Sequence, residues 1–335
     1  MKWLMILPLF ILACQKVEEK KPVVINGAGS TFIYPLLSKW SYNYHNETKN
    51  QINYQSIGSG GGIKQVTERT VDFGATDRPL DVKELDSAGL FQFPVVIGGV
   101  AVVVNLPNVK SGEMKLDEKT LCDIFLGKIQ NWNDERIRKL NPNLKLPNTK
   151  ITIVRRSDGS GTTFLFTNYL SKACNEWKEK VGFGTSVNWP VGIGAKGNEG
   201  VSNYVKQNEG TIGYVEYAYA KENNLVYVLL PSKKGIFLEP SLKTFQEASK
   251  YANWVKENHF YEVITYAEGD SAYPITGAVF VLVPREKKEK NKDVIEFYKW
   301  SFEKGDSTAI SLDYVPLPKE TKELVSSYWN EYILK

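Results

Sequence analysis

Residues 155–166, RRSDGSGTTFLF, combine side chains that could bind an anion with the start of a predicted helix. The guanidinium of Arg156 can give two parallel hydrogen bonds to an oxyanion, and Asp158 could hold that guanidinium in place. The Gly-Ser-Gly-Thr-Thr run adds hydroxyls and backbone N–H groups at a helix amino terminus, which favours negative charge. A surface Arg–Asp pair ahead of an ordinary capped helix is the alternative.

Two other loops have the same chemistry. Residues 26–32 (NGAGSTF) and 58–62 (GSGGG) each place glycine and hydroxyl side chains directly before a predicted helix. Glycine lets a ligand approach the backbone closely, and Ser or Thr adds hydroxyl donors. One such loop is weak evidence, because Ser and Thr also cap ordinary helices. Three of them in one chain predict that several helix ends converge on one small oxyanion.

A carboxylate with the opposite preference follows another predicted strand. Asp77 lies in the run DFGATDRP, just past the end of that short strand. A carboxylate repels a fully ionised anion, but it accepts a hydrogen bond from the P–OH group that phosphate retains near neutral pH. Sulfate has no such proton, and a site built for one hydrogen bond strongly rejects the analogue that lacks it. Taken alone, Asp77 could equally be a turn or capping acid.

The elements that would position these groups follow a repeated strand–loop–helix pattern, which predicts an α/β fold. In open α/β sheets, ligands bind at the carboxyl ends of the strands. Two glycines mark a break in the apolar run 93–104, which is therefore not expected to be one helix. The other expected strands are 23–25, 51–57, 71–75, 150–154, 213–215 and 275–283, and the expected helices are 116–126, 134–140, 162–173, 200–207, 244–258, 292–304 and 319–334.

Bulk composition sets few limits on the ligand. The chain has 335 residues, of which 42% are hydrophobic and 24% charged, with a net charge of +4 and both signs interspersed. This ordinary soluble composition is long enough for two domains. It does not indicate a nucleic-acid surface or an acidic partner, so selectivity must arise locally.

The sequence offers little for catalysis, cofactors or metals. The loop that contains Ser160 lacks a G-x-S-x-G elbow, and the two histidines, His45 and His259, lie far from Ser160 in sequence. Residues 192–197 fit G-x-G-x-x-G but follow a Trp-Pro pair, so a glycine-rich loop before a capped helix is favoured over a nucleotide site. A Walker A motif and a Cys–His zinc cluster are both missing. We expect a binding protein that is not an enzyme, without cofactor or metal.

The amino terminus is typical of an exported lipoprotein. Residues 1–13 combine Lys2 with an apolar run that fits a secretory signal peptide and is too short for a transmembrane helix. The run Ile-Leu-Ala-Cys resembles a lipobox and predicts lipidation of Cys14; a plain signal peptide with an incidental cysteine is the alternative. Residues 14–22 would form the lipidated end and a polar tether. We expect a periplasmic or cell-surface protein that contacts membrane only through this anchor.

Export also bears on the two remaining cysteines. Cys122 and Cys174 lie in or beside predicted helices in the same half of the chain. In an oxidising compartment they could pair as a disulfide, and the alternative is two separate buried thiols. The sequence leaves both possibilities open.

Long, ordered motifs along the chain resemble one protein family. From about Ile25 to the carboxyl terminus, the sequence is similar to the phosphate-binding proteins of bacterial phosphate-specific ABC transporters, the PstS family. The motifs that carry this resemblance are NGAGSTF, NYQSIGSGGGIKQ, VDFGATDRPL, GLFQFPVVIGGVAVVVN, IFLGKIQNWND, RRSDGSGTTF and TIGYVEYAYA.

The resemblance implies a two-lobed periplasmic-binding-protein fold, type II-like, with two mixed-sheet α/β domains joined by a hinge and the ligand in the cleft. Lobe 1 would comprise residues 23–104 and 274–335, and lobe 2 residues 105–273. Asp158 would be the partner of Arg156 and not a phosphate ligand. Ser30 and Gly60 depart from residues common in the family, and both departures spare the implied contacts. The implied phosphate ligands are Thr31, Phe32 (backbone N–H), Ser59, Asp77, Arg156, Ser160, Gly161 (backbone N–H) and Thr162.

The resemblance also implies partners. Inorganic phosphate would be captured by hinge closure and delivered to a membrane permease pair driven by a cytoplasmic ATPase, and the binding protein itself is expected to be a monomer. Two alternatives stay open. One is a receptor for another tetrahedral oxyanion, such as sulfate or molybdate, which Asp77 argues against. The other is a phosphate-sensing surface lipoprotein without a transport role.

Overall fold

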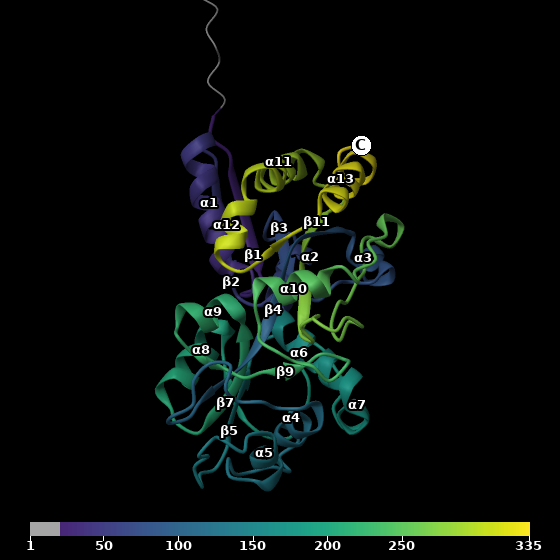
Figure 1. The fold of residues 1–335 in the computed structure, drawn as a ribbon. Coiled ribbons are helices and arrows are strands. Elements are labelled where there is room, and N and C mark those ends of the chain that lie inside the picture. The colour runs from purple at the N-terminus through teal and green to yellow at the C-terminus, as the bar shows by residue number, and fades with distance from the viewer. Residues whose placement is uncertain (1–20) are drawn as a thin grey trace, which may run out of the picture.

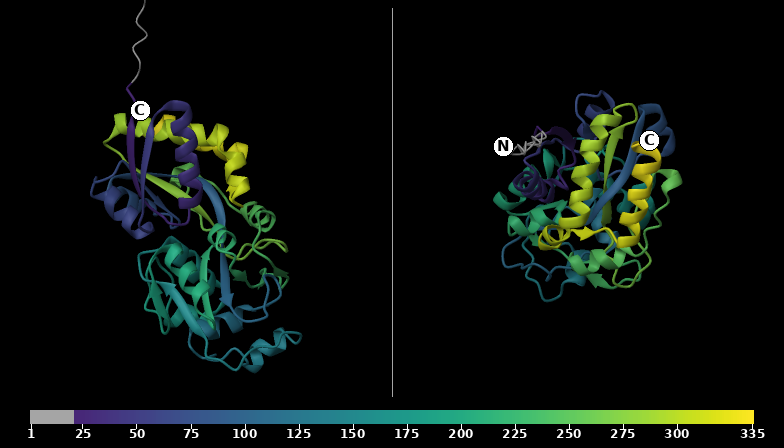
Figure 2. Two further views of the ribbon diagram at one scale, coloured as in Figure 1. Left: turned by 90° about the vertical axis from the view of Figure 1, so that its left-hand side faces the viewer. Right: turned by 90° about the horizontal axis from the view of Figure 1, so that it is seen from above.

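Two lobes make up the fold. The computed structural model describes residues 21–335, so the predicted signal peptide and Cys14 lie outside the described residues. One lobe lies above the other in Figure 1, and the strand labelled β4 passes from one to the other. The amino-terminal end of the described chain and the carboxyl terminus both belong to the upper lobe, lobe 1, whereas lobe 2 contains the middle of the chain (Figure 2).

Strands and helices alternate along much of the chain, as the repeated pattern predicts. The strands are β1 (Val24–Gly29), β2 (Gln51–Ser56), β3 (Phe73–Thr76), β4 (Leu90–Asn105), β5 (Thr152–Arg156), β6 (Ile193–Ala195), β7 (Thr211–Glu216), β8 (Val226–Tyr227), β9 (Leu230–Pro231), β10 (Phe237–Leu238), β11 (Thr276–Pro284) and β12 (Val315–Pro316). The α-helices are α1 (Tyr34–Thr48), α2 (Ser59–Thr67), α3 (Val82–Ala88), α4 (Glu118–Phe125), α5 (Glu135–Leu140), α6 (Gly161–Ala173), α7 (Asn175–Lys180), α8 (Gly197–Gln207), α9 (Tyr217–Glu222), α10 (Leu242–Ser249), α11 (Lys288–Lys304), α12 (Asp306–Ser311) and α13 (Lys319–Tyr328). A 3₁₀ turn (Lys256–Asn258) and a π turn (Trp329–Ile333) complete the set.

One mixed, ten-stranded sheet runs through both lobes. In lobe 1, β1 is parallel to β2 and β3, and β11 is antiparallel to β3 and β4. In lobe 2, β4 is antiparallel to β7, which is parallel to β5, and β5 is parallel to the edge strand β6. Parallel neighbours end at a common edge, so β1, β2 and β3 place their following loops close together.

Strand β4 connects the two lobes without interruption. It pairs with β11 as far as Gly99 and with β7 from Val100 onward, before the predicted lobe boundary at Val104. The apolar run 93–104 is therefore not a helix, as predicted, but the backbone does not break at the two glycines. The glycines are needed for packing, because a Cβ at Gly98 would lie 2.7 Å from the ring of Phe32, and one at Gly99 would overlap Phe245.

The predicted helices agree with the observed ones in position, with one marked exception. The helix expected over 244–258 ends at Ser249, and a loop and the 3₁₀ turn follow. Phe245 and Ala248 are buried on α10, while beyond it the chain turns so that Trp254 packs against Phe280 of β11. The segment between α10 and β11 was predicted as part of lobe 2. It touches both lobes, since Tyr266 packs against Tyr169 of α6.

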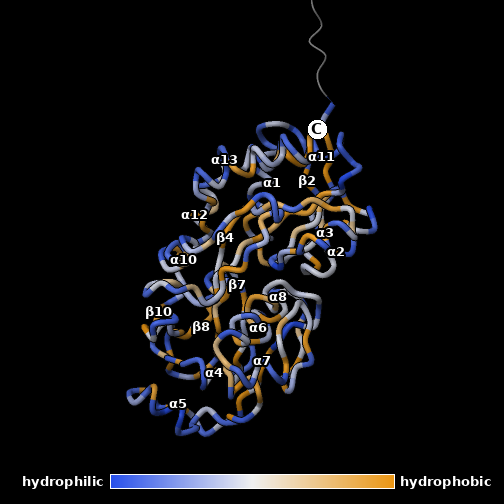
Figure 3. Tube along the Cα trace, turned by 90° about the vertical axis from the view of Figure 1, so that its right-hand side faces the viewer, coloured by the Kyte–Doolittle hydropathy of each residue, from blue (hydrophilic) through white to orange (hydrophobic). Residues whose placement is uncertain are grey.

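A single large hydrophobic cluster fills the interior of both lobes. Figure 3 shows apolar stretches along the strands inside each lobe. In lobe 2, Cys122 of α4 and Cys174 at the end of α6 form a disulfide, with Cα atoms 6.5 Å apart. Of the two possibilities that the sequence leaves open, a disulfide and two separate thiols, the structure has the disulfide. Over residues 21–335, none of the helices has both the length and the apolar character needed to cross a membrane.

Candidate functional site

The predicted loops meet where the two lobes face each other. Loops after β1 and β2, with the end of β3, come from lobe 1, and the loop after β5 comes from lobe 2. The N–H of Gly60 donates to the carbonyl of Gly159 at 2.8 Å, so the two lobes are in contact. The side chains predicted to bind the anion are buried here, with at most 3% of each residue exposed. The convergence predicted from three separate loops is therefore observed.

Asp77 lies at the centre of the lobe 1 side and is 1% exposed. Its backbone N–H donates to Ser59 Oγ at 3.2 Å, and its Oδ1 accepts from Ser30 Oγ. A Cβ at Gly161 would overlap Asp77 Oδ2 and Ser59 Oγ, so Oδ2 faces the start of α6 on lobe 2. Burial raises the pKa of Asp77 to about 7, against the lowering effects of Ser30, Arg156 and Ser59. Asp77 is therefore a buried acceptor, and not a turn acid in solvent.

Arg156 and Asp158 form a fixed pair on the lobe 2 side. Arg156 Nε donates to Asp158 Oδ1 at 2.8 Å, and Nη2 donates to Oδ2. The Arg156 side chain is only 1% exposed, so the alternative of a surface ion pair is wrong. Burial acts to raise the pKa of Asp158, but the hydrogen bonds and charge of Arg156 outweigh it and hold that pKa below its usual value. The carboxylate thus orients the guanidinium, as predicted.

The start of α6 supplies donors next to this pair. Ser160 Oγ accepts from the N–H of Thr163 at 3.0 Å, so this hydroxyl also caps the helix. Gly161 and Thr162 are the first residues of α6, where backbone N–H groups lack helical partners. Arg156 Nη1 donates to Thr162 Oγ1 at 3.4 Å, which ties the arginine to the helix start. The capping alternative therefore holds for Ser160, and the anion site at this loop stays a prediction that the position of these donors allows.

Asn198, which the sequence did not single out, joins two of the predicted ligands. It is fully buried at the start of α8, and its Nδ2 donates to Thr31 Oγ1 at 2.8 Å and to Thr162 Oγ1 at 3.2 Å. Thr31 belongs to lobe 1 and Thr162 to lobe 2, so this amide bridges the lobes. Asn198 follows the G-x-G-x-x-G stretch, whose Gly197 N–H donates to Asp158 Oδ1 at 3.1 Å. The last glycine of that stretch therefore helps to hold the partner of Arg156 in place.

Ser30 is a second residue that sequence reasoning missed. The family pattern predicts that serine at this position leaves the phosphate contacts unaffected, yet its hydroxyl is fully buried and hydrogen-bonded to Asp77. The N–H of Phe32, an implied phosphate donor, donates to Ser30 Oγ at 3.0 Å. Ser30 therefore lies between an implied donor and the predicted acceptor. Only its position two residues before Phe32 could have hinted at this role.

Buried hydroxyls from lobe 2 and from the carboxyl-terminal segment hold the first loop. Tyr219 of α9 donates to the carbonyl of Thr31 at 2.7 Å, and Tyr314 donates to the carbonyl of Phe32 at 2.6 Å. Tyr314 Oη also lies 3.0 Å from Glu216 Oε2, and desolvation raises the pKa of this buried Glu216 carboxyl well above its ordinary value. These contacts fix the backbone that carries the implied donors.

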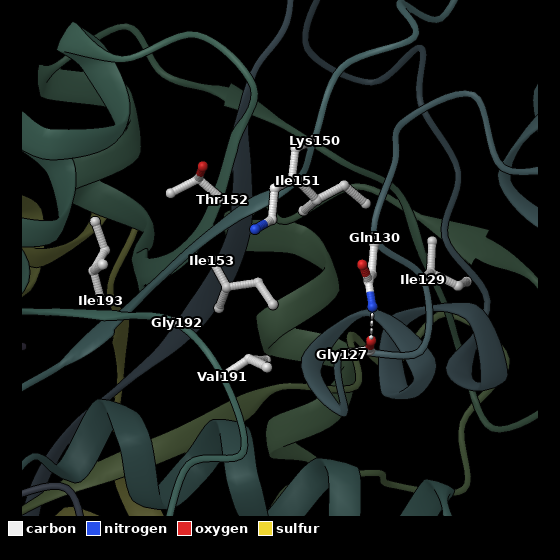
Figure 4. Close-up of a pocket in the computed structure, with 10 residues that line it drawn as sticks. All are labelled: Gly127, Ile129, Gln130, Lys150, Ile151, Thr152, Ile153, Val191, Gly192 and Ile193. Carbon is white, nitrogen blue, oxygen red and sulfur yellow. Dashed lines mark hydrogen bonds between the residues drawn. The ribbon is translucent and has the colours of Figure 1, made fainter.

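A cavity on lobe 2 and the two histidines lie outside this site, and neither the cavity nor the histidines involve a predicted site residue. A cavity of about 480 Å³ on lobe 2 is lined by apolar side chains such as Ile151 and Ile153, and its lining includes none of the predicted site residues (Figure 4). His45 contacts the carbonyl of Asn50, and His259 contacts Tyr328, so both histidines are engaged in lobe 1. Within residues 21–335, no group of three or more His, Cys, Asp or Glu side chains is placed to hold a metal ion.

Comparisons with known proteins match this chain to a PBP superfamily domain and to proteins named phosphate-binding protein PstS. The family model described as a PBP superfamily domain matches residues 16–304. A phosphate-binding protein PstS from Xylella fastidiosa is 53% identical over 314 residues, which covers 93% of this chain and 86% of the relative. A protein of the same name from Haemophilus influenzae is 49% identical over 91% of this chain and 92% of its own length.

Solved structures show the same fold. The high affinity periplasmic phosphate-binding protein PfluDING, bound with phosphate, has a TM-score of 0.73 at 22% identity, covering 91% of this chain and 93% of its own. A putative phosphate ABC transporter substrate-binding protein with bound phosphate from Clostridium perfringens has a TM-score of 0.65 at 20% identity, covering 88% of this chain and all of its own. The two-lobed periplasmic-binding-protein fold predicted from the sequence is confirmed.

Proposed function

Because this chain belongs to the PstS family of phosphate-binding proteins within the PBP superfamily, we propose that it captures inorganic phosphate outside the cytoplasm for import by an ABC transporter. The family consists of substrate-binding transport proteins. Relatives at 49–53% identity carry the phosphate-binding name over most of the chain. We further propose that the site binds phosphate without transforming it.

The observation that carries this proposal is the buried pairing of an acceptor with donors across the interface between the lobes. Asp77 is 1% exposed on lobe 1, and Arg156 is 3% exposed on lobe 2. Phosphate in its protonated forms needs both kinds of partner, since its P–OH group donates and its other oxygens accept. The Arg156 fork, the hydroxyls of Thr31, Ser59, Ser160 and Thr162, and the backbone N–H groups of Phe32 and Gly161 would supply the donors.

We infer that binding couples to hinge closure. Thr31, Ser59 and Asp77 lie on lobe 1, and the loop of Arg156 lies on lobe 2, so a bridging anion favours the closed arrangement by its differential affinity. Closure also excludes water, which lets fixed dipoles and one guanidinium stabilise the ligand without a full set of counter-charges. The closed shape is what a permease would recognise.

The cellular setting is part of the proposal. A signal peptide and lipidation of Cys14 would place the protein in the periplasm or at the cell surface, attached by its amino terminus. The partners would be a permease pair and its ATPase, with the binding protein itself monomeric. Transport can be separated from phosphate sensing by measuring phosphate uptake in a strain that lacks this protein.

Isothermal titration of the purified protein with phosphate, sulfate and arsenate tests the binding function. At a pH well above 7, where Asp77 is ionised, tight phosphate binding with negligible sulfate binding is expected, and arsenate should bind because it too keeps a proton there. Equal affinities for phosphate and sulfate would contradict the role of Asp77. A preference for sulfate or molybdate would indicate a receptor for another oxyanion.

A further inference from the structure

The Ser30 hydroxyl has two defined partners in the site. Its oxygen accepts from the N–H of Phe32 at 3.0 Å, and the hydroxyl is hydrogen-bonded to Asp77 Oδ1. All three groups belong to lobe 1: Ser30 and Phe32 follow β1, and Asp77 follows β3, which pairs with β1. These bonds therefore do not depend on contact between the lobes.

The direction of these bonds is fixed by elementary chemistry. A backbone N–H can only donate, so Phe32 uses a lone pair of Ser30 Oγ. An ionised carboxylate can only accept, so the single hydroxyl proton of Ser30 is directed to Asp77 Oδ1. Oδ2 is left facing the start of α6 at Gly161, on the opposite lobe. Ser30 thus occupies one carboxylate oxygen and leaves the other for a ligand proton.

Few charged groups face Asp77, so a single hydrogen bond can change the pKa of its carboxyl group. The facing charge from lobe 2 is Arg156, and Ser59 of α2 is a further hydrogen-bonding neighbour. The neighbouring titratable groups are the buried phenols of Tyr54 on β2 and Tyr314 before β12. Burial pushes the carboxyl toward its neutral form, and the bond from Ser30 opposes that effect.

We propose that Ser30 is a positioning residue for Asp77, which favours the ionised form of its carboxylate and aims that carboxylate at the proton of a protonated oxyanion. This inference rests on the proposed phosphate-binding function and extends it to selectivity. A neutral Asp77 would donate instead of accept, and the site would then admit a fully ionised dianion such as sulfate. Ser30 would therefore set the pH below which the site stops excluding sulfate.

The direct test is to titrate Asp77 in the ligand-free wild type and in ligand-free Ser30→Ala. Carboxyl ¹³C NMR monitors the ionisation of the side chain in both proteins. Loss of a donor to the charged form should raise the midpoint by about one pH unit. Ser30→Thr keeps the hydroxyl and should keep the wild-type midpoint. Ser232→Ala is a matched control, because Ser232 is an equally buried hydroxyl that accepts from Lys234 and Ile236 in the β9–β10 hairpin.

Sulfate gives the functional readout, because it stays fully ionised over this range and its binding reports only on the protein. In Ser30→Ala, sulfate binding measured by calorimetry should begin at a higher pH than in the wild type, by the same shift. A merely loosened site would instead weaken every anion at every pH. Equal Asp77 midpoints in wild type and Ser30→Ala would overturn the inference. Failure of the wild type to bind phosphate would instead reject the proposed function, and the midpoints would still decide the role of Ser30.

Discussion

At the scale of single residues, the site contains a buried carboxyl group, Asp77, on one lobe and a buried guanidinium, Arg156, on the other. Arg156 already has a carboxylate partner in Asp158, held by two hydrogen bonds. Asp77 has no such cation bound to it and relies on hydroxyl groups and on the more distant charge of Arg156. We therefore expect the site to tolerate an anion only if the anion brings a proton for Asp77.

Replacing Asp77 by asparagine tests that requirement. The amide has the same shape and can donate to an ionised oxygen, so sulfate should gain affinity relative to phosphate. We expect the phosphate-to-sulfate affinity ratio to fall by at least about a hundredfold, measured by titration calorimetry at neutral pH. Asp81→Asn is the control, because Asp81 is an exposed acid that caps α3 in the same lobe. An unchanged ratio in Asp77→Asn would mean that selectivity comes from another group.

The role of a single residue could be predicted from the sequence where the residue type and its spacing from a partner indicate one interaction. A bidentate donor two residues before an acid, in RRSDGSGTT, predicted the Arg156–Asp158 pair. Ser30 and Asn198 could not be found this way, because serine and asparagine are common in loops and helix caps. Their roles depend on which residues the fold brings to them, and that is a property of the sheet order.

At the scale of elements, the amino terminus of α6 determines how closely the lobes approach. Gly161 opens that helix directly against Asp77 Oδ2 and Ser59 Oγ, so a side chain there has no room in the closed arrangement. Gly58 has the same restriction, with a positive φ of 88° and Asp158 where its Cβ would be. Glycine at these positions serves close approach between elements of different lobes.

Gly161→Ala should therefore block closure while leaving each lobe folded. We expect phosphate affinity to fall by at least about a hundredfold, because a Cβ in a packed interface costs a few kcal/mol or prevents the contact. Titration calorimetry measures the loss, and circular dichroism checks the fold. Gly200→Ala in α8 is the matched control, since its Cβ would meet neighbours at ordinary distances of 3.5 Å and beyond. Wild-type affinity in Gly161→Ala would show that the loops keep a wider separation when phosphate binds.

The disulfide links α4 to the end of α6 across a sequence separation of 52 residues. In the chain-entropy model, closing a loop of this length stabilises the fold by about 4 kcal/mol. Replacing Cys122 and Cys174 by alanine should lower the free energy of unfolding by an amount of that order, as urea denaturation would show. The double variant should also lose any sensitivity to reductant. Equal stability of the wild type with and without reductant would contradict a structural role for the bond.

The positions of the elements were largely predictable, because hydrophobic periodicity and loop chemistry mark strands and helix starts. The glycines of β4 show where such reasoning stops. A Gly-Gly pair usually interrupts a strand, but here it makes room for the rings of Phe32 and Phe245 while the strand continues. That use of glycine depends on side chains distant in sequence.

At the scale of the whole molecule, the site is also the place where the lobes are joined in the closed arrangement. Asn198 links Thr31 to Thr162, Tyr219 holds the carbonyl of Thr31, and Gly60 contacts Gly159. We therefore expect ligand affinity and lobe closure to depend on the same residues. The family resemblance predicted the closure, but these lobe-to-lobe contacts are pairings between loops that the sequence alone does not align.

Asn198→Ala tests this coupling. The variant removes donors to both threonines and one bond between the lobes, so phosphate affinity should fall by about tenfold to a hundredfold. Small-angle scattering should show a smaller phosphate-induced decrease in the radius of gyration than in the wild type. Asn203→Ala, an exposed asparagine on the same helix, should leave both measurements unchanged. If Asn198→Ala binds phosphate and contracts like the wild type, the amide does not contribute to closure.

The uninterrupted course of β4 has a consequence for how the protein unfolds. The strand supplies backbone partners to the sheet in both lobes, and one hydrophobic cluster extends through both lobes. Even if the two lobes move about a hinge, they should therefore unfold as a single cooperative unit, because melting either lobe removes a strand from the other. Differential scanning calorimetry of the ligand-free protein should give one transition with matching calorimetric and van't Hoff enthalpies. For the same reason, a fragment that begins after Asn105 would lack the strand that β7 needs and should not fold alone.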